Sequence, residues 1–113
     1  MKYIIAMIQP DRLERVQELL FEKDINLMTV TQVLGCGRQK GITRVYRGRQ
    51  ESGNLLKKIK LEIAVNDDFV EPAVEAITKG AHSGKPGDGK IFILDLSETI
   101  RIGTGENGSV AIG

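Results

Sequence analysis

The sequence is poor in several residue types that carry much of protein chemistry. Among its 113 residues there is no tryptophan, and there are two tyrosines, three phenylalanines, one histidine (His82) and one cysteine (Cys36). A lone cysteine excludes an internal disulfide framework, and together with a lone histidine it cannot supply a tetrahedral zinc site. A catalytic constellation of histidine with carboxylate or cysteine is therefore hard to assemble, which argues against an enzyme.

Long apolar runs are missing as well. No run approaches the roughly 18 residues that a membrane span requires, and the short apolar start of the chain shows no processing site. We therefore expect a cytoplasmic protein. The composition, 41% hydrophobic and 27% charged, suits one soluble globular domain over residues 1–113.

Glycine and basic residues, by contrast, are concentrated. All thirteen glycines lie within 35–53, 80–89 and 103–113, where we expect loops or a tail. Eight of the sixteen basic residues lie within 38–60 together with a single acid, Glu51, so this segment carries a net charge of +7. Such a segment predicts either a basic surface for phosphates, carboxylates or nucleic acid, or a solvated loop.

Apolar periodicity predicts four main strands, at 2–9, 28–34, 58–65 and 90–96, with a short fifth strand at 99–102. The strand at 58–65 alternates: Ile59, Leu61, Ile63 and Val65 share one face, and Lys58, Lys60 and Glu62 share the other.

Two helices are predicted from helical spacing and from start signals. The first runs from a capping box at Asp11 and Glu14 to about Lys23. The second follows cap candidates at Asn66–Asp68 and ends near Gly80–Gly84. No period holds over 37–55, so we expect a long loop there that is functional or disordered, and 103–113 is expected to be a flexible tail.

The order of elements matches an α+β, ferredoxin-like fold (βαββαβ). In this fold a four-stranded antiparallel sheet carries both helices on one face, and here a long loop joins strands two and three. The first and last main strands are apolar almost throughout, although helices cover one face only. A second cover is therefore needed, most simply a symmetric partner, and we expect a homo-oligomer.

The main chemical motif is the stretch 83–92. Its glycines at 84, 87 and 89 permit positive φ and leave N–H groups bare, and its two lysines add cationic donors. This combination suits polyphosphates, but the Walker spacing is absent. The residues alone leave two interpretations open, a nucleotide site and a plain helix-to-strand turn.

A second candidate is the glycine-flanked segment 35–41. Arg38 offers a forked donor to a phosphate, and Gln39 offers a neutral oxygen to a hydrated cation or a ligand. Arg101, near the C-terminus, is a further candidate cation.

Several segments, in order and without gaps, resemble the P-II nitrogen-regulatory signal-transduction family. They are T-V-T-x-V-x-G-x-G-R-Q-K-G (29–41), Tyr46-Arg47-Gly48, the strand 58–63, the stretch 83–93 and the ending 100–106. The resemblance implies a non-enzymatic ferredoxin-like homotrimer that binds ATP or ADP in clefts between subunits. It also implies 2-oxoglutarate as an effector, which acts by reshaping the loop at 37–55.

The resemblance further implies roles for individual residues. The phosphates would be held by Gly87, Gly89, Lys90 and Arg101 with Gly37 and Arg38 across the cleft, and Asp88 belongs to the same candidate set. The adenine and ribose would lie against Met7, Thr29, Glu62 and Ala64. Gln39 would bind the Mg²⁺ that accompanies ATP, and Lys58 would pair with a carboxylate of 2-oxoglutarate.

Three positions depart from the family pattern. Glu51 stands where the family has the tyrosine that accepts uridylyl or adenylyl groups. Gln9 and Gly103 stand where a basic residue is common. Each of the last two changes removes a charge from a ligand site, so we expect altered affinity there.

The expected partner is an ammonium channel or a nitrogen-metabolic enzyme, reached through the loop 37–55. Arg47 would be the group inserted into a channel, and a transporter would recruit the protein reversibly to the membrane. The alternative is a nucleic-acid-binding ferredoxin-like module, since RNA-recognition domains share this order of elements. Such domains stack bases on sheet aromatics, whereas only 4% of this sequence is aromatic.

Overall fold

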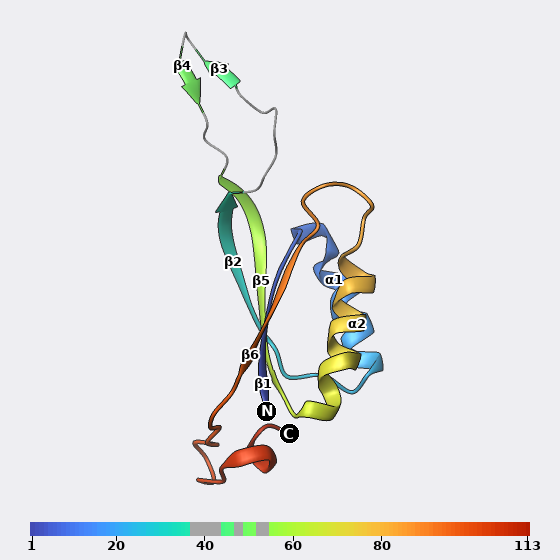
Figure 1. Ribbon diagram of the computed structural model, residues 1–113, viewed down its shortest axis with the longest axis vertical. Helices are drawn as coiled ribbons and strands as arrows, with labels where there is room; N and C mark the ends of the chain where they lie inside the picture. The colour runs from blue at the N-terminus through green and yellow to red at the C-terminus, as the bar shows by residue number, and fades with distance from the viewer. Residues whose placement is uncertain (37–43, 47–48, 52–54) are drawn as a thin grey trace.

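The computed structural model describes residues 1–36, 44–46, 49–51 and 55–113 (Figure 1). In chain order the strands and helices are β1 (Lys2–Ile8), α1 (Leu13–Glu22), β2 (Thr29–Cys36), β3 (Arg44–Tyr46), β4 (Arg49–Glu51), β5 (Leu55–Val65), α2 (Val70–Ala81) and β6 (Gly89–Asp95). Three 3₁₀ turns complete them: η1 (Pro10–Arg12), η2 (Asp67–Phe69) and η3 (Gly108–Ala111).

The main sheet has four strands in the order β2-β5-β1-β6, with every neighbouring pair antiparallel. Both helices lie on the same side of this sheet (Figure 1). The predicted ferredoxin-like α+β fold is therefore confirmed. The four main strands lie within two or three residues of their predicted bounds.

The sheet has one face against the helices and one open face. Toward the helices, β1 and β5 contribute fully buried side chains: Ile4, Ala6, Ile8, Ile59, Leu61, Ile63 and Val65. This confirms the alternation predicted for β5. By register, the open face consists of Tyr3, Ile5, Met7, Thr29, Thr31, Val33, Gly35, Leu56, Lys58, Lys60, Glu62, Ala64, Lys90, Phe92 and Leu94.

The two helices approach each other closely at Gly80. A Cβ added there would lie 2.8 Å from Cγ2 of Val16 on α1, so any larger residue would force the helices apart. Gly80 is therefore a buried packing position inside α2, and the helix ends one residue later, as predicted.

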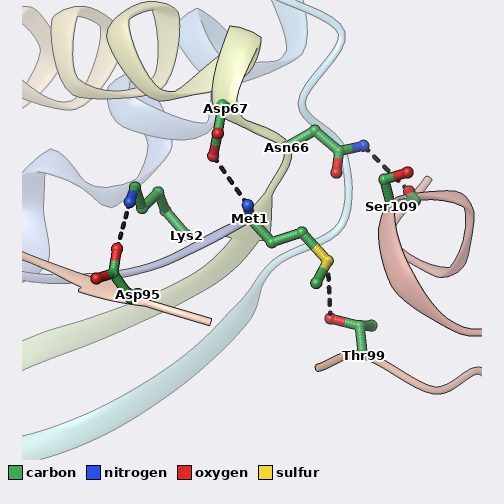
Figure 2. A network of polar contacts seen from close by, with 7 residues as sticks. All are labelled: Met1, Lys2, Asn66, Asp67, Asp95, Thr99 and Ser109. Carbon is green, nitrogen blue, oxygen red and sulfur yellow. Dashed lines mark hydrogen bonds and ion pairs between the residues drawn. The ribbon is translucent and has the colours of Figure 1, made fainter. Parts of the chain in front are cut away.

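The predicted helix caps are wrong. Both helices are entered through 3₁₀ turns, and no side-chain cap hydrogen bond is made at any of these starts. Asp11 therefore lies inside η1 instead of at an N-cap. Asp67 instead accepts a hydrogen bond from the ammonium group of Met1 at 2.9 Å (Figure 2).

The long connection between β2 and β5 is not free of regular structure. Arg44 pairs with Glu51, Val45 with Gln50 and Tyr46 with Arg49, which forms a short two-stranded sheet. β5 also begins at Leu55, three residues before the strand that we predicted. Alternation over so few residues is too short to be seen in a sequence window.

The C-terminal segment contacts the start of the chain and the end of β5. Instead of the short strand predicted at 99–102 there is a single bridge between Ile100 and Asn107. Asn66 donates to the Ser109 carbonyl at 3.1 Å, and the Thr99 hydroxyl donates to the sulfur of Met1 (Figure 2). The flexibility expected for 103–113 stays a prediction.

Candidate functional site

The connection from α2 to β6 has the backbone that its glycines predict. Gly84, Gly87 and Gly89 have φ angles of 80°, 91° and 120°, a region that side-chain-bearing residues rarely adopt. Gly89 is the most constrained, because a Cβ there would lie 1.7 Å from the Met7 carbonyl oxygen. Only glycine lets β6 pair with β1 at this point.

Ser83 and Asp88 close this connection, which we call the 83–89 loop. Asp88 Oδ2 accepts the Ser83 amide at 2.9 Å, and Asp88 Oδ1 accepts the Ser83 hydroxyl. The Ser83 oxygen accepts the Lys85 amide at 3.2 Å, and His82 Nδ1 lies 3.5 Å from Asp88 Oδ2. The Ser83 hydroxyl and amide hold the pKa of Asp88 below its ordinary value, so the carboxylate stays ionised.

A pocket of about 450 Å³ lies between this loop and the end of the sheet. It is lined by Met7, Gly35, Cys36, Leu56, Lys58, Pro86, Gly87, Asp88, Gly89, Lys90 and Phe92. Its size is within the range of small-molecule sites. The fold thus brings six of the candidate residues together: Met7, Lys58, Gly87, Asp88, Gly89 and Lys90.

Lys58 and Gln9 both bind the same backbone carbonyl. Gln9 Nε2 donates to the Gly87 oxygen at 2.6 Å, and Lys58 Nζ donates to it at 3.3 Å. An ammonium group has three donors, so Lys58 retains donors for an anion in this pocket. Gln9 departs from the family pattern, and its contact with the Gly87 carbonyl, 78 positions away, was not predicted from the sequence.

Thr29, Glu62 and Ala64 lie elsewhere on the open face. Thr29 pairs with Glu62 across β2 and β5, and Ala64 lies two residues further from the pocket. Lys90 is on β6, at the opposite edge of the sheet. Three strand spacings separate β2 from β6, a distance of about 14 Å.

The Glu62 carboxylate has two partners on the open face. The Tyr3 hydroxyl donates to Oε2, and Lys60 Nζ lies 3.4 Å from Oε1. The Tyr3 hydrogen bond, more than the charge of Lys60, lowers the pKa of Glu62, and the same bond raises the pKa of Tyr3. Sequence analysis missed this pair, whose members are 59 positions apart.

Arg101 lies at the far end of the sheet from the 83–89 loop. Its guanidinium donates to the Gly113 carbonyl at 2.9 Å and lies 3.6 Å from Glu106 Oε1. The whole length of β6, about 20 Å, separates this end from Gly89. Within one chain, Arg101 therefore does not join Gly87, Gly89 and Lys90, although all four were expected to hold the phosphates.

Gly37, Arg38 and Gln39 lie outside the described residues, as do Arg47 and Gly48. The expectation that Gly37 and Arg38 hold phosphates and that Gln39 binds Mg²⁺ stays a prediction. Cys36, which immediately precedes them, lines the pocket and is exposed.

In the described part of the chain, no three His, Cys, Asp or Glu side chains are grouped as a metal ion requires. None of the helices found there is both long enough and apolar enough to cross a membrane.

Comparison with known proteins agrees with this architecture. A family model described as "Nitrogen regulatory protein P-II" matches residues 1–106. The chain belongs to the P-II family. The resemblance found in the sequence is thus confirmed over nearly the whole chain.

Curated P-II proteins are similar along their full lengths. Nitrogen regulatory protein GlnK1 of Methanosarcina mazei is 51% identical over 114 residues, which cover 99% of this chain and 97% of that protein. Nitrogen regulatory protein P-II 1 of Escherichia coli K12 is 50% identical over 112 residues, which cover 99% of this chain and all of that protein. P-II proteins are signal-transduction proteins and not enzymes, so this chain has a regulatory role in nitrogen metabolism.

Proposed function

We propose that this P-II protein is a homotrimer that binds ATP or ADP between its subunits and senses 2-oxoglutarate. Bound ligands change the state of the loop 37–55, which contacts the regulated protein. The observation that carries this proposal is the pocket at the end of the sheet. There two positive-φ glycines, Gly87 and Gly89, and two lysines, Lys58 and Lys90, surround one space.

The chemistry of this pocket suits a polyphosphate. Glycine backbones with positive φ present N–H groups without side-chain cover, and an anion is bound well by such groups. Lys90 and Lys58 add charged donors, each contributing roughly 1.5–3 kcal/mol when well aligned. The adjoining apolar side chains of Met7, Leu56 and Phe92 suit a nucleoside.

The separation of the candidate residues supports a site between subunits. Arg101 lies about 20 Å, the length of β6, from the end of the sheet that holds Gly89 and Lys90. Arg101 and Lys90 would both contact the phosphates of one nucleotide if Arg101 came from a second chain. The apolar open face offers a surface for that chain, since Phe92 and Leu94 are 48% and 47% exposed. Burial of such side chains favours association by roughly 25 cal/mol per Å².

Subunit complementation tests this arrangement. Lys90→Ala and Arg101→Ala should each weaken ATP binding about tenfold or more. When equal amounts of the two variants are refolded together, about three trimers in four are mixed. Each mixed trimer has one interface with both native residues, so calorimetry should recover about one strong site in four. Lys79→Ala, an exposed lysine on α2, serves as the control. No recovery in mixed trimers, or a stable monomer by light scattering, would contradict a site between subunits.

Lys58 is the group that we assign to 2-oxoglutarate. Its ammonium is held near the pocket by the Gly87 carbonyl and has donors left for a carboxylate. Gln39 would bind Mg²⁺ with ATP and so link the nucleotide to the effector. Because Gln9 is neutral, we expect 2-oxoglutarate to bind weakly and to need MgATP.

We assign the output to the loop 37–55, acting on an ammonium channel or a nitrogen-metabolic enzyme. The protein would be cytoplasmic and reversibly recruited to the membrane by a transporter. Glu51 excludes nucleotidylylation at that position, so ligands alone would control the loop. Membranes that hold the cognate ammonium channel should capture the protein and lose it on Arg47→Ala; equal capture of the variant would refute the channel assignment.

A further inference from the structure

Asp88 lies at the centre of the 83–89 loop, yet its carboxylate is already used within the chain. One oxygen accepts the Ser83 hydroxyl, and the other accepts the Ser83 amide and faces His82. These contacts connect the two ends of the loop across Gly84 and Gly87. What Asp88 still offers to a ligand is its backbone.

We propose that Ser83 and Asp88 form a clamp that positions the 83–89 loop for phosphate binding without contacting the nucleotide through their side chains. This inference rests on the proposed nucleotide site. Glycine has more backbone freedom than any other residue, so a loop containing Gly84 and Gly87 does not hold its own shape. A loop that is ordered before the ligand arrives binds more tightly, because less conformational freedom is lost on binding.

The clamp and simple electrostatics make opposite predictions for Asp88. A carboxylate close to a phosphate repels it, so removing this charge should tighten binding if charge alone decides. Asp88→Asn keeps the size of the side chain but removes its charge, so the two charge-assisted hydrogen bonds from Ser83 are replaced by weaker neutral contacts. If the clamp decides, this neutral variant binds ATP more weakly despite the lost repulsion.

Calorimetric titration of the full chain with ATP and with ADP tests the inference. We expect Ser83→Ala and Asp88→Asn each to weaken binding about tenfold, the usual effect of losing a hydrogen bond to a charged group. Ser83→Thr retains the hydroxyl and should restore affinity. Ser97→Ala and Asp68→Asn are matched controls, because both residues are exposed at the opposite end of the sheet; these variants should bind as the wild type does.

Amide hydrogen exchange measured by NMR without nucleotide gives a second readout. The Ser83 amide donates to Asp88, so it should exchange faster in Asp88→Asn. The Lys85 amide donates to the Ser83 hydroxyl oxygen, so it should exchange faster in Ser83→Ala. Tighter binding by Asp88→Asn, unchanged binding by Ser83→Ala, or unchanged exchange would overturn the clamp. If the wild-type protein bound no nucleotide, both the proposed function and this inference would be wrong. If the wild type binds nucleotide and the variants bind equally well, only the inference about Ser83 and Asp88 would be wrong.

Discussion

The two ends of the main sheet differ in how they use charge. At the end where β1 begins, Lys2 is paired with Asp95, and Arg101 lies 3.6 Å from Glu106. Surface pairs of this kind contribute little to stability, about 0–1 kcal/mol each. They do, however, leave this end of a single chain with few cations free for a ligand.

At the other end the cations are not neutralised in this way. In the part of the chain that the structure describes, Lys58, Lys85 and Lys90 make no ion pair with a carboxylate. They lie in or beside the 83–89 loop, whose three glycines have positive φ angles. Within a single chain, therefore, the described cations without a carboxylate partner are those at the loop end, whereas Arg101 already lies beside Glu106 before a second chain brings it to a nucleotide.

The largest effect that we predict is a loss of stability when Gly89, at the end of the 83–89 loop, is replaced. Gly89→Ala places a Cβ against the Met7 carbonyl at a φ of 120°, so we expect a loss of roughly 2–5 kcal/mol of unfolding free energy. The melting temperature measured by circular dichroism should fall by about 10 °C or more. Gly103→Ala is the control, since its Cβ would meet nothing within 4 Å. Equal melting temperatures for the two variants would contradict the assigned role of Gly89 in strand pairing.

The next effect concerns two lysines on the same face of β5. Among the described residues the Lys58 ammonium group has one hydrogen-bond partner, the Gly87 carbonyl, whereas Lys60 Nζ lies 3.4 Å from Glu62 Oε1. Lys58→Ala should weaken 2-oxoglutarate binding in the presence of MgATP about tenfold or more, because a charged donor is lost. Calorimetry should show Lys60→Ala close to wild type. A similar loss in both variants would mean that pairing does not separate binding lysines from structural ones.

A smaller effect is expected on the pH dependence of stability. The Ser83 hydroxyl lowers the pKa of Asp88, and the hydrogen bond from Lys2 lowers the pKa of Asp95, both from an ordinary value of 3.8. The unfolded chain therefore binds more protons near that value, so the stabilisation is present above about pH 4 and is lost as the pH falls further. Thermal unfolding at pH 7, 4 and 3 should show a shallower acid loss for Asp88→Asn and for Asp95→Asn than for wild type. If both variants lose stability as steeply as wild type between pH 4 and pH 3, these two contacts do not cause the loss of stability in acid.

The smallest effect is expected at Tyr3. Tyr3→Phe keeps the ring but removes the hydroxyl that donates to Glu62, so the pKa of Glu62 should rise toward its ordinary value. An NMR titration of the Glu62 carboxyl group measures this change. A pKa of Glu62 that is the same in both proteins would show that Lys60 alone sets it.

Short-range patterns explain the successful sequence predictions. The alternation of Ile59, Leu61, Ile63 and Val65 predicts which face of β5 is buried, because successive side chains point to opposite faces of a strand. The start signals were less reliable. Asp11 and Asp67 lie inside 3₁₀ turns that precede the two helices, so neither residue is placed to cap a helix start.

By itself, the sequence determined the order of the four main strands and two helices, the buried face of β5, and the positive φ of the glycines in the 83–89 loop. Each of these depends on the backbone period or on the chemistry of one residue. Only the tertiary structure decided that Gln9 and Lys58 meet at the Gly87 carbonyl and that Arg101 lies a sheet length from Lys90. Such relations depend on strand register and chain direction, which join residues dozens of positions apart and leave no local pattern.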